Sequence, residues 1–180
     1  MTQTMPKIKK SDLKKYIRDI PDFPKPGIMF KDISTLLKDK DALKKGVDML
    51  AKQYKRENIK YIVAVESRGF IFGSILAYKL GAGFIPIRKK GKLPFKTKSV
   101  TYDLEYGTDT LEIHEDAIEP GSRVLVVDDL LATGGTVRAV CDLLKQQEAN
   151  IVGVAFLIEL TFLKGKQRLK DLPLYSVIKF

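Results

Sequence analysis

Two adjacent aspartates followed by a glycine-rich turn are the residues of this chain best placed to do chemistry. Asp128 and Asp129 follow the apolar run 124–127, and the small residues 132–136 come next, before a helical pattern. Small residues that run into a helix present free N–H groups to a phosphate. Carboxylates instead accept hydrogen bonds from sugar hydroxyls, or hold Mg²⁺ through water. The segment therefore predicts a site for a phosphorylated sugar; an ordinary solvated acidic turn is the alternative.

A second segment stands in the same relation to a strand and a helix. Glu66-Ser67-Arg68-Gly69 follows the apolar run 61–65 and precedes a helical pattern, which again suits a phosphate. A plain helix cap by Ser67 is the alternative interpretation. The lysine-rich loop 89–97 either closes over such a site or is simply solvated.

The elements that must position these residues alternate along the chain. Apolar runs predict strands, and a 3.6-residue periodicity predicts helices. The alternation favours an α/β fold whose parallel sheet is covered on both faces. The expected strands are 61–65, 83–87, 124–127, 151–158 and 175–180, and the expected helices run to Ile20 and over 41–54, 69–80, 137–144 and 163–169. We also expect an irregular arm over 22–28 and a hairpin over 99–113 that turns at residues 106–109.

The composition limits the class of protein. With 180 residues, 44% hydrophobic and 30% charged, the chain fits one globular domain. No apolar run approaches the roughly 20 residues of a membrane span, and the lysine-rich start lacks a secretory apolar segment. The one cysteine, Cys141, excludes an internal disulfide, so we expect a cytoplasmic protein. The net charge of +10 admits a nucleic-acid partner, but lysines scattered over helix faces favour a solvated surface.

Five segments together resemble the adenine phosphoribosyltransferases of the type I phosphoribosyltransferase family. The stretch 124–136 is similar to that family's motif for phosphoribosyl pyrophosphate (PRPP). Four more segments agree in order and spacing and narrow the resemblance to the adenine enzymes. They are 24–33 (PKPGIMFKDI), 66–70 (ESRGF), 88–94 (RKKGKLP) and 104–107 (LEYG).

The resemblance implies a fold and a reaction. It implies a central, mostly parallel sheet flanked by helices in a single domain over 1–180. A small N-terminal helix and base-recognition arm (1–33) and a mobile loop with a flap hairpin (89–113) would complete that domain. The implied reaction, in purine salvage, is displacement of pyrophosphate from PRPP by N9 of adenine to give AMP. Mg²⁺ would be held mainly by the substrate, and the enzyme would be a homodimer without nucleic-acid or membrane partners.

The resemblance also assigns a role to each matching residue. Glu105 would handle the purine proton, Tyr106 would pack over the site, and the loop that carries Lys92 would exclude water. We further expect a cis peptide between Glu66 and Ser67. The catalytic residues implied are Arg68, Lys92, Glu105 and Tyr106. The 5′-phosphate residues are Ala132, Thr133, Gly134, Gly135 and Thr136; the ribose residues are Asp128 and Asp129. The pyrophosphate residues are Glu66, Ser67, Arg68, Arg88 and Lys89, and the adenine residues are Met29, Phe30, Lys31 and Leu130.

One position favours adenine over a 6-oxopurine. Enzymes of the hypoxanthine type usually carry an acidic residue where this chain has Ala132. Two other classes of function stay open: a PRPP-sensing regulator that binds nucleic acid, and an enzyme of the same fold that uses guanine, hypoxanthine or orotate. The residues before Asp22 are too few for a helix-turn-helix module, which argues against the regulator.

Overall fold

The computed structural model describes residues 9–103 and 107–180. The chain divides into two compact units, one that ends at Met49 and one over Leu50–Phe180. Helix α2 (Lys40–Tyr54) runs across the boundary between them. Within the described residues, no helix is long and apolar enough to span a membrane.

The first unit contains a small two-stranded sheet where a longer helix was expected. The helical segment η1 ends at Tyr16, because Ile17 is already extended, with φ −105° and ψ 122°. The prediction of a helix to Ile20 is therefore wrong. Arg18 lies opposite Asp32 across the sheet, and hydrogen bonds from Ser34 and Arg18 lower the pKa of Asp32 to about 2. The elements are η1 (Lys10–Tyr16), β1 (Arg18–Ile20), β2 (Phe30–Asp32) and α1 (Ser34–Lys38).

The second unit is built on a seven-stranded sheet in the order β5-β6-β4-β3-β7-β8-β9. Strands β4, β3, β7, β8 and β9 are parallel, and the β5–β6 hairpin joins the edge of β4 antiparallel. This confirms the mostly parallel sheet. The strands are β3 (Tyr61–Val65), β4 (Gly83–Lys89), β5 (Thr97–Asp103), β6 (Thr108–His114), β7 (Arg123–Leu131), β8 (Asn150–Glu159) and β9 (Leu174–Lys179).

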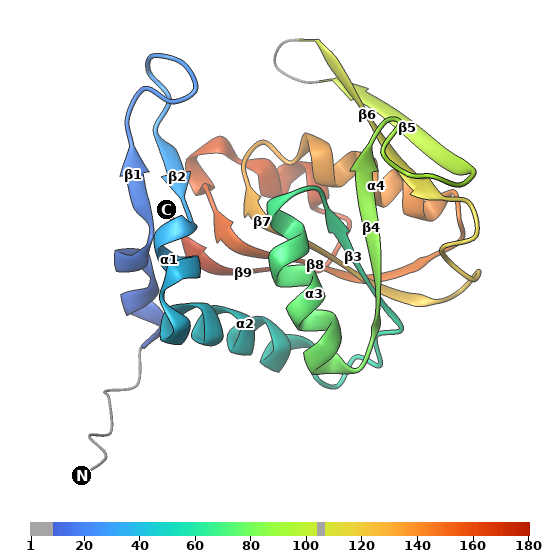
Figure 1. The fold of residues 1–180 in the computed structure, drawn as a ribbon, viewed down its shortest axis with the longest axis horizontal. Helices are drawn as coiled ribbons and strands as arrows, with labels where there is room; N and C mark the ends of the chain where they lie inside the picture. Colours follow the sequence, from blue (N-terminus) through green and yellow to red (C-terminus); the bar gives the residue numbers. More distant parts are fainter. Residues whose placement is uncertain (1–8, 104–106) are drawn as a thin grey trace. The chain divides into compact units, whose positions relative to one another are not determined.

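Helices cover both faces of this sheet (Figure 1), as the alternation predicts. Successive side chains of a strand point to opposite faces. Ile62 and Ala64 of β3 face α3 (Arg68–Leu80), and a Cβ on Gly73 would lie 2.6 Å from that of Ala64, so only glycine allows this approach. Val63 and Val65 belong instead to the buried cluster that includes the apolar side of α4 (Gly135–Lys145).

Several boundaries differ from those expected. Strand β4 extends to Lys89, which was assigned to the loop. Thr108 and Asp109 belong to β6, where they pair with Asp103 and Tyr102, so the prediction that these two residues lie in the turn is wrong. The helix expected over 163–169 consists of two 3₁₀ segments, η2 (Thr161–Leu163) and η3 (Gly165–Leu169). Lys164, at φ +55°, lies between them and prevents one continuous helix.

Candidate functional site

A cavity of about 430 Å³ lies where β3, β4 and β7 end. Because these strands are parallel, their carboxyl ends meet at one edge of the sheet, which is where α/β folds bind ligands. The lining combines the two segments that the sequence singled out with residues of the flap hairpin. It consists of Val65, Glu66, Ser67, Arg68, Lys89, Tyr102, Asp109, Leu111, Asp128, Asp129, Leu130 and Thr136.

The paired aspartates lie within β7 and not after it, which corrects the sequence prediction. Pairing of β7 with β3 stops at Val127, whereas pairing with β8 continues to Leu131. One side of the strand is thus released, and Asp128 and Asp129 line the cavity there. Burial in the surrounding protein, and then the negative charge of Asp129, raise the pKa of Asp128 well above its usual value.

Arg68 partly compensates this buried negative charge. Its Nε lies 2.9 Å from Oδ2 of Asp129, whose side chain is 5% exposed. Burial raises the pKa of Asp129, and the Arg68 guanidinium opposes that shift. Arg68 is the first residue of α3, and the peptide before Ser67 is cis, which confirms that prediction. Ser67 makes no capping hydrogen bond through its side chain, so the interpretation as a plain cap is wrong.

Glu66 gathers the basic residues of β4 and the following loop. Its Oε1 lies 2.8 Å from Nζ of Lys92 and 3.3 Å from Nη2 of Arg88. Its Oε2 accepts a hydrogen bond from the N–H of Lys89 at 3.2 Å. The Lys92 contact is the strongest of the causes that lower the pKa of Glu66 to about 2, although burial opposes it. Glu66 therefore remains charged and keeps the side chains of Arg88 and Lys92 close to the carboxyl end of β3.

The glycine-rich turn forms a small cavity of its own, about 80 Å³, lined by Asp128 and residues 130–137. Gly134 precedes α4 with φ +82°, a conformation that glycine tolerates best. A Cβ on Gly134 would lie 2.7 Å from the carbonyl oxygen of Gly165. A Cβ on Gly165 would overlap the carbonyl oxygen of Ala132. The turn and η3 therefore touch backbone to backbone, with N–H groups of the first turn of α4 beside the cavity.

Four lining residues were not selected from the sequence as site residues: Val65, Tyr102, Asp109 and Leu111. Tyr102 and Asp109 lie opposite one another in the hairpin register, so they share a face. The turn predicted at residues 106–109 placed Asp109 outside the strand, so its pairing with Tyr102 was not expected. Tyr102 Oη accepts a hydrogen bond from Thr136 Oγ1 at 3.4 Å, which links the hairpin to the glycine-rich turn.

Of the other predicted residues, Arg88 and Lys92 contact Glu66, residues 132–135 line the smaller cavity, and the arm residues are described within their own unit. Met29, Phe30 and Lys31 belong to the first unit, where Phe30 makes an edge contact with Phe23 and Lys31 lies 2.6 Å from Asp19. Glu105 and Tyr106 lie outside the described residues.

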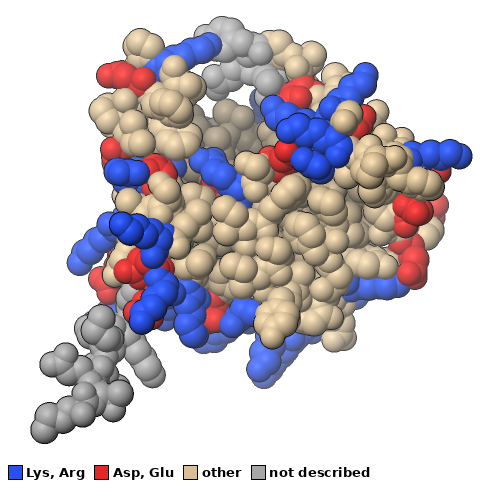
Figure 2. Space-filling model, viewed as in Figure 1, with Lys and Arg blue, Asp and Glu red and all other residues tan. Residues whose placement is uncertain are grey.

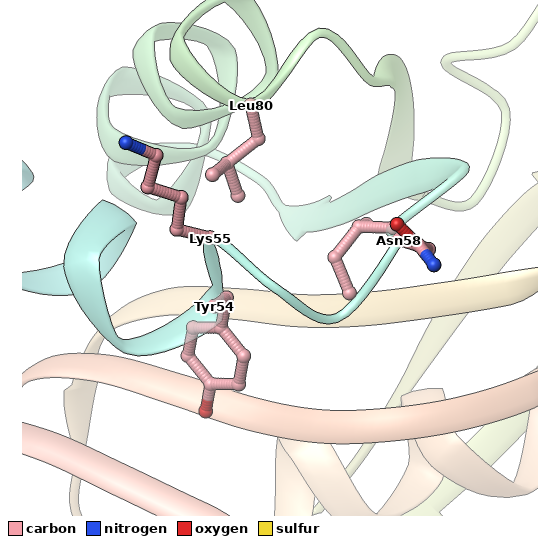
Figure 3. Close-up of a pocket in the computed structure, with 5 residues that line it drawn as sticks. Tyr54, Lys55, Asn58 and Leu80 are labelled. Atoms are coloured by element: carbon pink, nitrogen blue, oxygen red, sulfur yellow. The ribbon is translucent and has the colours of Figure 1, made fainter.

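A second cavity lies between the end of α2 and the start of β3 (Figure 3). Its volume is about 300 Å³. The Tyr54 hydroxyl donates to the carbonyl of Val154 at 3.4 Å, and Lys55 and Asn58 point in opposite directions. The lining offers no convergent set of polar groups, so the edge of the sheet is the better candidate site. It is lined by Tyr54, Lys55, Asn58, Ile59 and Leu80.

Comparison with known proteins agrees with this geometry. The family model of the phosphoribosyl transferase domain matches residues 34–179. An adenine phosphoribosyltransferase of Acidobacterium capsulatum is 57% identical over 168 residues, which cover 93% of this chain and 93% of that protein. The crystal structure of the Thermoanaerobacter pseudethanolicus adenine phosphoribosyltransferase has a TM-score of 0.93 at 51% identity, covering 96% of this chain and 100% of that chain. The Saccharomyces cerevisiae enzyme, crystallised with an imino-altritol bisphosphate and adenine, has a TM-score of 0.88 at 41% identity, over 93% of this chain and 97% of that chain.

Proposed function

The chain belongs to the adenine phosphoribosyltransferase family, and from this membership we propose how its residues divide the work of the reaction. The enzyme transfers the 5-phosphoribosyl group of PRPP to N9 of adenine and releases AMP and pyrophosphate, a step of purine salvage. The bond from the anomeric carbon to pyrophosphate breaks as the bond to N9 forms. Positive charge develops on the ribose and negative charge on the leaving group, so catalysis depends on positioning and electrostatic stabilisation.

The observation that carries the assignment of roles is the convergence of residues 66–68 and the paired aspartates on one cavity, which shares Asp128, Leu130 and Thr136 with the smaller cavity of the glycine-rich turn. The N–H groups and hydroxyls of residues 132–136 are proposed to bind the 5′-phosphate. Asp128 and Asp129 then accept hydrogen bonds from the ribose hydroxyls. Their negative charge also favours the cationic character that the ribose acquires as the bond breaks.

The leaving pyrophosphate is assigned to the cations at the ends of β3 and β4. Arg68 and Lys89 line the cavity, and Glu66 holds Arg88 and Lys92 beside it. These charges would stabilise the developing pyrophosphate anion, with Glu66 and Ser67 shaping the loop that receives it. Lys92 lies on the loop proposed to close over the substrates and exclude water.

Adenine recognition is assigned to the arm of the first unit and to Leu130. Phe30 would stack on the purine and Leu130 would cover its other face. The backbone groups of Met29 and Lys31 would read the edge of the base. Glu105 would take up the proton that N9 loses, with Tyr106 packed over the site.

Mg²⁺ is proposed to enter with PRPP. Among the described residues, no group of three or more His, Cys, Asp or Glu side chains is placed to hold a metal ion. Mg²⁺ is commonly held by substrate phosphates with one or two carboxylates, and Asp128 and Asp129 supply oxygen donors of that kind. When bound, it would neutralise part of the charge on the leaving pyrophosphate.

A homodimer in the cytoplasm is the proposed state of the enzyme. The outer side of α3 presents a largely uncharged surface (Figure 2), where Tyr78 is 89% exposed, with Phe84 of β4 36% exposed. Apolar surface of this kind favours burial against a partner. Sedimentation of wild type and Tyr78→Glu tests the interface: a dimer that the substitution dissociates supports it, and a wild-type monomer contradicts it.

The activity is tested by pyrophosphate release from PRPP and Mg²⁺ with adenine, hypoxanthine, guanine or no base. Release with adenine alone is expected. Asp129→Asn should lower kcat/KM roughly 100-fold or more, because Arg68 loses its counter-charge and the ribose loses an acceptor. Release with the oxopurines would contradict the argument from Ala132, and an unaffected Asp129→Asn would remove the aspartates from the mechanism.

A further inference from the structure

Asp109 lines the cavity but has no part in the mechanism proposed above. It lies on β6, and its side chain is 22% exposed. Its Oδ1 accepts a hydrogen bond from the N–H of Thr110 at 2.9 Å, and its Oδ2 lies 3.1 Å from Nζ of Lys89. The backbone thus orients one oxygen of the carboxylate while the other contacts the cation.

We propose that Asp109 competes with pyrophosphate for Lys89 and so limits how tightly the enzyme holds this product. The inference rests on the proposed function, in which Lys89 binds the leaving group. Pyrophosphate must exchange the Asp109 contact for its own and bring further negative oxygens close to a fixed carboxylate. Both steps weaken binding of the anion.

This competition has a use in the catalytic cycle. Several cations converge on pyrophosphate, and product release limits the turnover of many enzymes. A carboxylate that reclaims Lys89 as pyrophosphate leaves would favour release of this product. Because Lys89 is 58% exposed, solvent weakens the pair and the effect should be moderate.

The test is calorimetric titration of pyrophosphate, with Mg²⁺ present, into wild type and Asp109→Asn. Asparagine keeps an oxygen for the N–H of Thr110 but loses the charge. We expect the Kd for pyrophosphate to fall roughly three- to tenfold, with AMP affinity unchanged. Asp109→Ala provides a second variant, expected to shift the Kd in the same direction.

The matched control is Asp103→Asn, which removes one charge from the same hairpin at an exposed residue outside the cavity lining. The control should leave the Kd within about twofold, since net charge alone acts weakly. In a Lys89→Gln background, Asp109→Asn should tighten binding less than it does in wild type, because only the direct repulsion between the carboxylate and pyrophosphate remains to be removed. If Asp109→Asn binds pyrophosphate no more tightly than Asp103→Asn, the inference is wrong. If wild type neither releases nor binds pyrophosphate, the proposed function itself fails.

Discussion

At the scale of single residues, the site places negative charge where the fold itself does not favour it. Asp128 and Asp129 are adjacent, enclosed and on a released side of β7, with Arg68 beside the second of them. Burial and mutual repulsion raise the pKa of Asp128. Such an arrangement is useful to a substrate that brings hydroxyls and positive charge, and it costs stability when no such substrate is bound.

This cost leads to a prediction for Asp128→Asn. Because the pKa of Asp128 is raised on folding, the folded chain keeps its proton at pH values where the unfolded chain has lost it. Stability contributed by this group is therefore present below the ordinary aspartate pKa and declines as pH rises towards the raised pKa. Asparagine can still accept the hydrogen bond from the N–H of Asp129. Because it carries no charge, it removes the loss of stability at higher pH. We expect Tm to rise by about 2–4 °C at pH 7.5, with no gain at pH 4.

Thermal denaturation at both pH values measures this effect, and Asp116→Asn is the control. Asp116 is exposed, so its substitution should leave Tm unchanged at either pH. A destabilised Asp128→Asn at pH 7.5 would show that the carboxylate contributes more through its contacts than burial costs.

At the scale of elements, the glycine-rich turn depends on a segment far along the chain. The turn touches the backbone of Gly165 at the start of η3, and a side chain there would overlap the carbonyl of Ala132. The conformation of the turn, which we propose binds the 5′-phosphate, thus depends on its contact with a second loop as well as on its own sequence.

Gly165→Ala should separate these loops. We expect KM for PRPP to rise about tenfold or more, because N–H groups that bind phosphate tolerate little displacement. Steady-state kinetics with PRPP varied and adenine saturating measures the change. Gly121→Ala is the control: its φ of +76° is strained for alanine, but it precedes β7, at the end opposite to the turn. It should lower Tm and leave KM unaltered, and equal KM values in both variants would contradict the role of the contact.

At the scale of the whole molecule, the chain carries a net charge of +10. On the face shown in Figure 2, lysines and arginines are interspersed with acidic residues and lie around an uncharged area. Several basic residues at the cavity are paired with carboxylates, as Lys92 is with Glu66. A face of this kind gives a weak general attraction for anions and shows no continuous basic stripe of the sort that follows a nucleic-acid backbone.

Nucleic-acid binding should therefore disappear at physiological ionic strength. In fluorescence anisotropy with labelled single-stranded RNA and duplex DNA, we expect no saturable binding at about 0.15 M salt. PRPP turnover should persist under the same conditions. Retained binding at that salt concentration would instead revive the regulator hypothesis.

The sequence by itself determined the strand–carboxylate–glycine pattern at 124–136 and most strands and helices, whereas the cis peptide at Glu66 was expected from the family resemblance. These features are local, because apolar periodicity and small residues act within a few neighbours of the chain. Only the tertiary structure decided which groups meet across the cavity. The register that places Asp109 opposite Tyr102 and beside Lys89, the contact of Gly165 with the turn, and the release of β7 from β3 at Val127 all depend on pairing between distant segments. A shift of one or two residues in a hairpin changes every such partner, which is why local patterns could not supply them.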